Sequence, residues 1–372
     1  MHSLLQVLAS FGRILQGDLF PALESELGPL SDLQQKLVRT LALLQLDGFV
    51  VARHGRGRRP HDRAAIARAF VAKAVFNFPT TRALLDRLRD DIVLRRLCGW
   101  EAVSEVPDET VFSRAFAEFA ASRFAERVHT ALIERTQGER LVGHISRDAT
   151  AIEAREKPVP KPKPEKTEKP KPEPRYRKGA KKKKTPEQMT RLERQCSGTM
   201  TVEQMLEELP RVCDVGCKTN SNGHKYVWIG YKLHLDVADG QIPISCVLTS
   251  ASLHDSQVAV PLAELTAQRV TSLYDLMDSG YESDLISQRS RDLGHVPIID
   301  AQKRGTQEPA MAPHQAVRFR ERTAVERVYS RLKDEFGGQY VRVRGWAKVM
   351  THLMFGILAL SVDQILRLAP SP

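Results

Sequence analysis

The spacing of apolar residues changes near residue 140, and this change limits the folds open to the chain. Up to about Gly138 the apolar side chains recur at helical intervals, most clearly over residues 108–121. Residues 141–150 have no helical stripe and suit a strand. A length of 372 residues is enough for two domains. We therefore expect an all-helical N-terminal domain over residues 1–138, followed by a domain that contains a sheet.

The second half of the chain alternates strand-like and helical runs. The strand-like runs lie at residues 226–237, 242–249, 272–277 and 295–299. An alternating order of strands and helices indicates a mixed α/β domain. We expect this domain to comprise residues 139–155 and 225–345, and residues 346–372 to form a C-terminal helix and tail.

A segment rich in lysine and proline interrupts this pattern after residue 155. Residues 156–184 hold 13 Lys or Arg against 4 Glu and have almost no apolar side chain to bury. We expect residues 156–224 to form an insertion that is disordered at least to residue 190. It is either an arm that contacts DNA phosphates, above all through Lys181, Lys182, Lys183 and Lys184, or a solvated insertion in a surface loop.

The net charge of +11 lies mostly in that segment, so the rest of the chain is nearly neutral. A second local excess of basic residues runs from Arg318 to Lys348. The five cysteines form an odd set without paired CxxC spacing, which favours a reduced, cytoplasmic setting. The apolar stretch at residues 353–362 is too short for a bilayer, so we expect no membrane partner.

The short helices of the first half allow two interpretations. Tight turns between them are compatible with a helix-turn-helix unit that reads DNA. They are equally compatible with a plain helical bundle.

One helix near residue 326 carries the strongest functional signal. Phe319, Arg322, Glu326 and Lys333 fall within one arc of a helix, so that an acid is flanked by two cations. A neighbouring stripe is expected to bury against a sheet, and it consists of Val325, Tyr329, Leu332 and Phe336. An ordinary amphipathic helix with salt bridges would show the same pattern.

Two further acids follow strand-like runs. Asp148 lies near the end of the strand at 141–150, and Asp278 comes directly after the strand at 272–277. Functional groups of open α/β sheets gather at such strand ends. Two Asp and one Glu can hold a pair of Mg²⁺ ions for phosphodiester chemistry, although Asp275, Glu282, Asp284, Asp300 and Glu335 lie close by in the sequence.

These residues resemble bacterial insertion-sequence transposases of the DDE class, in the group with a Tyr-x2-Arg-x3-Glu-x6-Lys signature. Phe319 stands where that group usually has Tyr, while Arg322, Glu326 and Lys333 match. Residues 278–281 (Asp-Ser-Gly-Tyr) are similar to the block of its second acid, and Asp148 to that of its first. The stretches 230–234 and 254–256 in the catalytic half, and 57–60 and 106–110 in the helical half, are similar to recurring family stretches.

The resemblance implies a ribonuclease-H-like catalytic domain that cuts DNA at transposon ends and joins the 3′-hydroxyls to target DNA. It implies Asp148, Asp278 and Glu326 as ligands of two Mg²⁺ ions, for which Mn²⁺ can substitute, with Arg322, Lys333 and the residue at 319 near DNA. It also implies a homodimer or larger assembly on DNA in a bacterial cytoplasm, associated with the nucleoid, and no small-molecule substrate. Two alternatives stay open: a metal-dependent nuclease on the same fold, and a DNA-binding protein derived from an inactive transposase.

Overall fold

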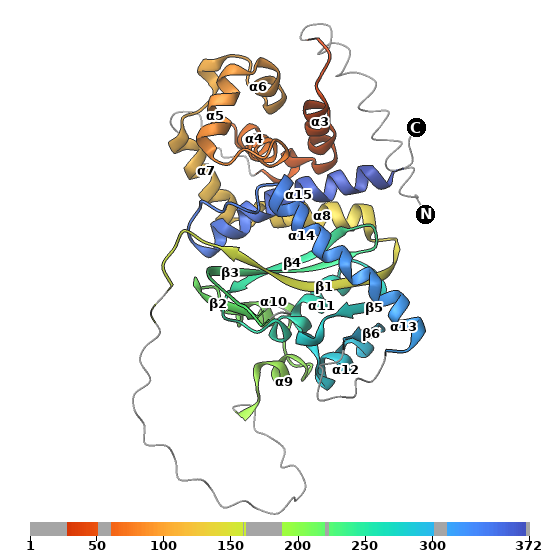
Figure 1. Ribbon diagram of the computed structural model, residues 1–372. Coiled ribbons are helices and arrows are strands. Elements are labelled where there is room, and N and C mark those ends of the chain that lie inside the picture. Colours follow the sequence, from red (N-terminus) through yellow and green to blue (C-terminus); the bar gives the residue numbers. More distant parts are fainter. Residues whose placement is uncertain are drawn as a thin grey trace, which may run out of the picture.

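The computed structural model describes residues 28–50, 61–158, 160, 188–219, 223–300 and 311–369. A helical part stands above a mixed sheet with helices on both of its faces (Figure 1). The expected fold class, an α/β part preceded by helices, is confirmed at this level. Residues 1–27, the stretch 57–60 and Lys181 to Lys184 lie outside the described residues.

The described residues up to 138 are helical, as predicted. Its elements are α3 (Asp32–Leu44), η1 (Leu46–Phe49), α4 (Arg63–Val75), α5 (Thr81–Asp90), α6 (Ile92–Cys98), η2 (Val103–Glu105), α7 (Glu109–Ala121) and α8 (Phe124–Gln137). Side chains that accept hydrogen bonds from the first turn fix where several of them start, namely Asp62, Thr80, Asp91 and Asp108. Gly99, with a φ of +106°, ends α6.

Within the described residues, six strands form one sheet. They are β1 (Leu141–Glu153), β2 (Asp214–Thr219), β3 (Lys225–Ala238), β4 (Ile242–Ser250), β5 (Thr271–Met277) and β6 (Val296–Ile299). β3 pairs antiparallel with β1, β2 and β4, whereas β5 runs parallel to both β1 and β6. Gly230 has a φ of +152°, and a Cβ there would lie 2.1 Å from the carbonyl oxygen of Ile152, so only glycine fits where β3 passes from β2 to β1.

The remaining helices cover the two faces of the sheet (Figure 1). On one face lie α13 (Pro313–Phe319), η6 (Arg320–Arg322), α14 (Thr323–Glu335) and α15 (Trp346–Leu368). On the other lie α9 (Arg191–Gln195), α10 (Val202–Glu207), η4 (Asp255–Gln257), α11 (Ala259–Ala267), η5 (Ser279–Tyr281) and α12 (Asp284–Asp292). α14 packs on β1 and β3 through Val325, Val328, Tyr329 and Leu332. The predicted buried stripe of this helix is confirmed, including Phe336 just beyond its end.

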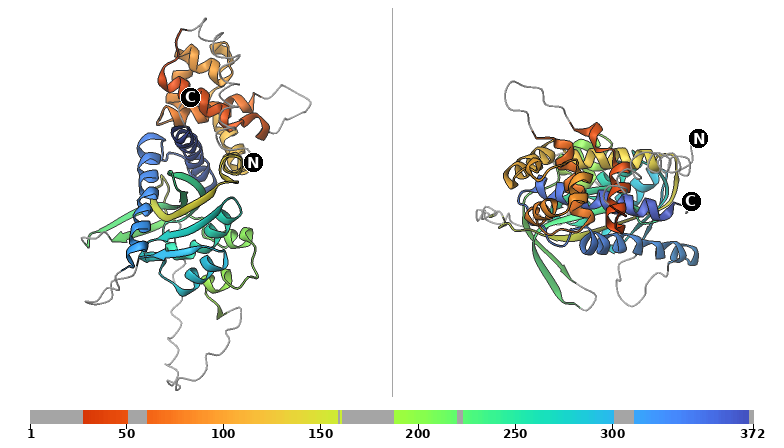
Figure 2. Two further views of the ribbon diagram at one scale, coloured as in Figure 1. Left: turned by 90° about the vertical axis from the view of Figure 1, so that its right-hand side faces the viewer. Right: turned by 90° about the horizontal axis from the view of Figure 1, so that it is seen from above.

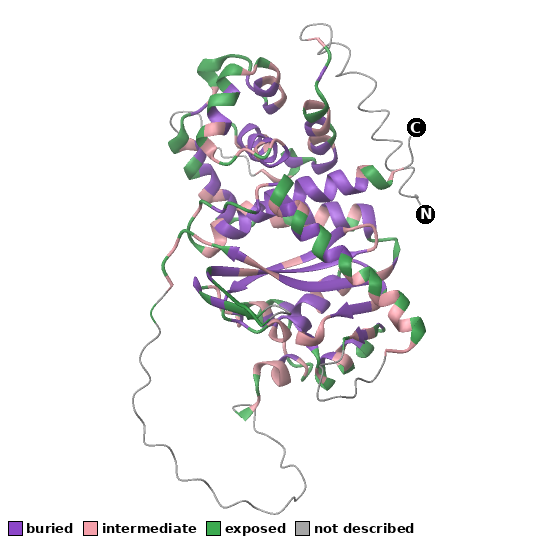
Figure 3. Cartoon of the chain, viewed as in Figure 1, coloured by how far each residue is buried: buried purple, intermediate pink, exposed green. Residues whose placement is uncertain are grey.

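α15 joins the helical part to the sheet. It contacts α3, α4, α7 and α8 on one side and β4 on the other, and it is buried over most of its length (Figures 2 and 3). Its Phe355 ring packs against Phe70, Phe116 and Phe124 of the helical part. α15 is long and apolar enough to cross a membrane by length and composition, and 89% of its most apolar window is buried inside the protein. Such burial is typical of a core helix.

Regular structure resumes earlier than the sequence predicted. We expected an insertion as far as residue 224, but α9, α10 and β2 all precede Lys225. β2 belongs to the sheet because it pairs with the first residues of β3. The apolar stretch Val215 to Cys217 is too short to predict a strand from the sequence, because the strand depends on its pairing with β3.

Candidate active site

Two neighbouring parallel strands bring the first two predicted acids side by side. In the register of β1 and β5, Arg147 lies opposite Met277. The next residue of each chain segment is an acid, Asp148 within β1 and Asp278 directly after β5. Because this register places the two residues side by side, their carboxylates lie close enough for the charge of Asp278 to act on Asp148.

Arg322 connects the third predicted acid, Glu326, to Asp148. Arg322 precedes α14, and its Nη2 lies 3.0 Å from Oε1 of Glu326. Its Nη1 lies 3.9 Å from Oδ2 of Asp148. The guanidinium therefore stands between the first and third acids, while the Glu326 side chain is 54% exposed.

Asp148 is held in a buried position. Burial raises the pKa of Asp148 to about 6, and the negative charge of Asp278 adds to this rise. A hydrogen bond from the main chain at Ala149 and the charges of Arg322 and Lys218 act in the opposite direction. At neutral pH the group is mostly ionised, but it takes up a proton far more readily than an exposed aspartate.

Asp278 follows β5 directly and also caps a short helix. Its carboxylate caps η5 by accepting a hydrogen bond from the main-chain nitrogen of Gly280 at 3.0 Å. Gly280 suits this turn because a Cβ there would lie 3.0 Å from Oδ1 of Asp278. The cap fixes the orientation of the second acid.

Tyr329 on α14 fastens the helix to the strands that carry the site. Its hydroxyl donates to the main-chain oxygen of Asp148 at 2.6 Å and accepts from the nitrogen of Leu235 at 3.2 Å. The sequence predicted the burial of Tyr329 but not this use of its hydroxyl. These hydrogen bonds fix the position of α14 relative to Asp148.

We predicted that the four signature residues share one helix, but Phe319 ends α13, Arg322 lies in η6, and Glu326 and Lys333 lie in α14. Lys333 donates to Oγ1 of Thr150 at 2.8 Å, and burial lowers its pKa. Phe319, in the last turn of α13, has its ring centre 5.9 Å from the guanidinium carbon of Arg322. Phe319 thus supports Arg322, which the sequence did not predict.

Other acids near the signature have structural partners. Asp275 is fully buried and interacts with Ser290 and His295, and Glu335 pairs with Arg331 at 2.8 Å. These contacts favour structural duties for both residues.

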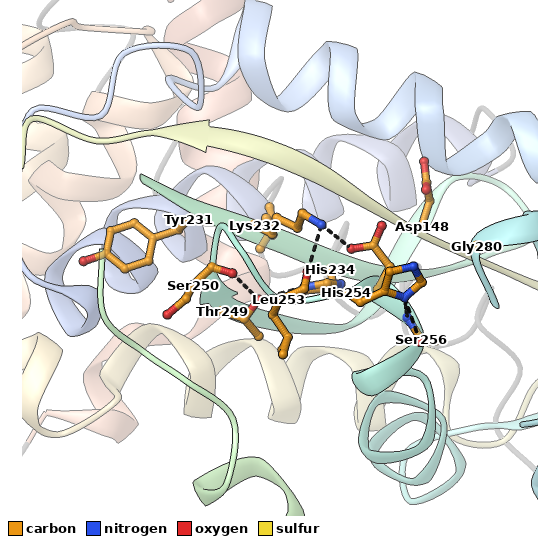
Figure 4. Close-up of polar contacts among 12 residues, drawn as sticks. Asp148, Tyr231, Lys232, His234, Thr249, Ser250, Leu253, His254, Ser256 and Gly280 are labelled. Atoms are coloured by element: carbon orange, nitrogen blue, oxygen red, sulfur yellow. Dashed lines mark hydrogen bonds and ion pairs between the residues drawn. The ribbon is translucent and has the colours of Figure 1, made fainter. Parts of the chain in front are cut away.

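The sequence did not single out Lys232, Asp255 and Tyr281 as site residues. Lys232 of β3 forms an ion pair of 2.9 Å with Asp255, and Figure 4 shows the Lys232 amine beside His254. In the register with β1 Lys232 lies opposite Ala151, so its side chain projects from the other face of the sheet than that of Asp148. Burial raises the pKa of Tyr281 well above its usual range, with further contributions from the charges of Asp255, Asp148 and Asp278. The stretches 230–234 and 254–256, which are similar to family stretches, contain Lys232 and Asp255 and could have indicated these two residues.

Carboxylates are the ligands that divalent metals such as Mg²⁺ prefer. Asp148, Asp278 and Glu326 supply such oxygens, and Nη1 of Arg322 is a buried donor beside them that has no hydrogen-bond partner among the residues that the structure describes. Within the described ranges, no three His, Cys, Asp or Glu side chains lie close enough to form a ready metal cluster. The three carboxylates are of the chemical type that binds a divalent metal. In this structure the positive charge between Asp148 and Glu326 comes from Arg322.

Two family models match the chain. A model described as "Transposase domain (DUF772)" matches residues 25–118, and one described as "Transposase DDE domain" matches residues 210–362. The chain belongs to the DDE transposases of insertion sequences. The second match contains Asp278 and Glu326 of this transposase, whereas Asp148 precedes it. No curated protein and no solved structure matches the chain.

Proposed function

We propose that this transposase cleaves DNA at the ends of its own element and joins the freed 3′-hydroxyls to target DNA, with Asp148, Asp278 and Glu326 as metal-binding acids. One observation carries the proposal: the register of β1 and β5 sets Asp148 beside Asp278, and Arg322 links Asp148 to Glu326 on α14. The acids come from three elements that lie far apart in the sequence. A purely structural role for them would not require this convergence.

Two divalent ions, Mg²⁺ or Mn²⁺, when bound, supply a strong nucleophile at neutral pH and neutralise charge on the leaving oxygen. Asp148 must be ionised to serve as a ligand, so its raised pKa makes the site sensitive to mild acid. We expect Arg322 to exchange its contact with Glu326 for a DNA phosphate, since guanidinium groups bind both kinds of oxygen. We expect Lys333, which donates to Thr150, to hold a neighbouring phosphate.

The strand pattern supports a ribonuclease-H-like core. Three antiparallel strands (β4, β3 and β1) continue into two parallel ones (β5 and β6), with α14 across the face that bears the acids. We assign the sheet and its helices to catalysis and the helical part up to residue 138 to DNA binding. The basic segment that includes Lys181 to Lys184 is proposed to add contacts with DNA phosphates.

We further propose that the protein works as a dimer or larger assembly on paired element ends, in the bacterial cytoplasm. A metal-dependent nuclease would use the same acids but would not join strands. The position of Arg322 between two acids also suits a DNA-binding protein that has lost its activity.

A joining assay with pre-cut element ends separates these three functions. The protein is mixed with pre-cut ends, target DNA and Mg²⁺, and in parallel with uncut ends. Joined products support the transposase, cleavage without joining supports the nuclease, and binding without either supports the inactive form. Asp278→Ala is the control, because it should abolish both reactions while keeping DNA binding.

A further inference from the structure

A cleft lies between the helical part and the linking segment, which is residues 336–345 between α14 and α15. Its volume is about 510 Å³. Buried aromatic rings from both sides form its floor, among them Phe70, Phe112, Phe336 and Phe355. The linking segment forms the rim, on which Tyr340 is 65% exposed.

Among the described residues, the cations of this cleft have no acidic partners. Five line it, from α4, the end of β1, the linking segment and the first turn of α15: Lys73, Arg155, Arg342, Arg344 and Lys348. In the part of the chain that the structure describes, no carboxylate forms an ion pair with any of them. Among the described lining residues Glu109 is the one acid, and it pairs with Arg82 at 3.3 Å. An uncompensated group of like charges indicates an anion as ligand.

Lys73 lines the cleft and is affected by the positive charge of a neighbouring cation. It is half-buried on α4, and burial together with the charge of Arg342 lowers its pKa to about 8. The linking segment is held in place, because the main-chain nitrogen of Gly345 donates to Oε1 of Glu156 at 2.8 Å. The charges of Lys73 and Arg342 therefore lie close enough to act on each other.

The cleft lies at the end of a path that starts at the acids. β1 and α14 run side by side from the level of Asp148 towards the linking segment (Figure 1). The hydrogen-bonded pair Lys333 and Thr150 lies along this path, between Asp148 and the cleft. Arg155, which lines the cleft, comes two residues after the end of β1. At about 3.3 Å per residue, Asp148 and Arg155 are separated by roughly 20 Å along the chain.

We propose that this cleft binds the phosphates of a DNA segment that extends from the catalytic acids, with Tyr340 packing against its sugar or base. This inference rests on the proposed function. One strand of a duplex carries a charge about every 3.4 Å, so the path corresponds to about six base pairs. DNA binding is thereby shared between the helical part and the linking segment of the catalytic part.

The test is the salt dependence of DNA binding by the full chain. Fluorescence anisotropy gives the affinity of wild type and of Arg342→Ala/Arg344→Ala/Lys348→Ala for a labelled duplex that carries the element end. We expect the slope of log affinity against log salt to become shallower by about 0.9 for each phosphate that the variant no longer neutralises. Arg342→Lys/Arg344→Lys keeps the charges and should keep the slope.

Arg291→Ala, on the exposed face of α12, is the control for removal of a surface charge elsewhere. Thermal unfolding checks that the triple variant is folded, which we expect because the three cations form no ion pair with any described residue. An unchanged slope in a folded triple variant overturns the inference. The joining assay with wild type reports separately on the proposed function, since joining by wild type together with an unchanged slope would reject the cleft alone.

Discussion

The hydroxyl of Tyr329 donates a hydrogen bond to the main-chain oxygen of Asp148 at 2.6 Å. It also accepts from the main-chain nitrogen of Leu235, so one side chain of α14 satisfies polar groups of both β1 and β3. These residues are buried or nearly so. The hydrogen bonds join the helix that carries Glu326 to the strand that carries Asp148.

Tyr329→Phe tests this connection. Removal of the hydroxyl leaves buried main-chain groups without a partner, so we expect the free energy of unfolding to fall by about 1–3 kcal/mol. Strand cleavage should fall more than DNA binding, because α14 is released from Asp148. Urea unfolding and a cleavage assay measure the two effects. Tyr340→Phe, at an exposed tyrosine, is the matched control, and equal stability of the two variants would contradict the prediction.

Asp148→Asn should stabilise the metal-free protein near neutral pH. Folding raises the pKa of Asp148 from 3.8 to about 6, so its contribution to stability is present below about pH 4 and is lost as the pH rises through 6. At about 1.4 kcal/mol per pKa unit, the variant gains up to ~3 kcal/mol at high pH and nothing in acid.

Urea unfolding in the presence of a chelator, at several pH values, measures this difference. Glu326→Gln is the control, since that side chain is 54% exposed and its replacement should change stability little. Added Mg²⁺ should stabilise wild type and not Asp148→Asn. A variant that is less stable than wild type at every pH would refute the argument.

Local signals in the sequence were sufficient for much of the fold. The helix starts at Asp62, Thr80 and Asp108 depend on side chains within three residues of the groups they cap. The buried stripe of α14 follows from its own periodicity. Both kinds of pattern are complete within a short window of the chain, so they need no knowledge of the tertiary structure.

Features that depend on distant partners could not be predicted. β2 is a strand because β3 lies beside it, and Arg322 stands between Asp148 and Glu326 only once α14 rests on the sheet. The register of β1 and β5, which aligns Asp148 with Asp278, is likewise a property of the assembled sheet. Sequence could propose the three acids, but not the cation between two of them.

The buried pair of Arg147 and Asp236 is another such feature, and it yields a prediction. Two hydrogen bonds of 2.7 Å join the groups, and both side chains are almost completely buried. Asp236→Ala leaves a buried cation without its partner and should cost about 3–5 kcal/mol of stability. Arg147→Met/Asp236→Leu removes both charges and should recover most of that loss. Urea unfolding decides this, and a double variant no more stable than Asp236→Ala would contradict it.

Two buried histidines should make the protein sensitive to acid. Burial lowers the pKa of His129 to about 3 and that of His234 to about 4. Because these values lie below the ordinary 6.5, each neutral imidazole contributes stability that is present above pH 6.5 and is lost as the pH falls through the folded pKa. Near pH 5 each should cost on the order of 2 kcal/mol relative to neutral pH. His234→Gln should therefore reduce the loss of stability between neutral and acid pH in urea unfolding, whereas His314→Gln, at an exposed position, should leave it unchanged. An acid sensitivity that is the same in both variants and wild type would assign the effect to other groups.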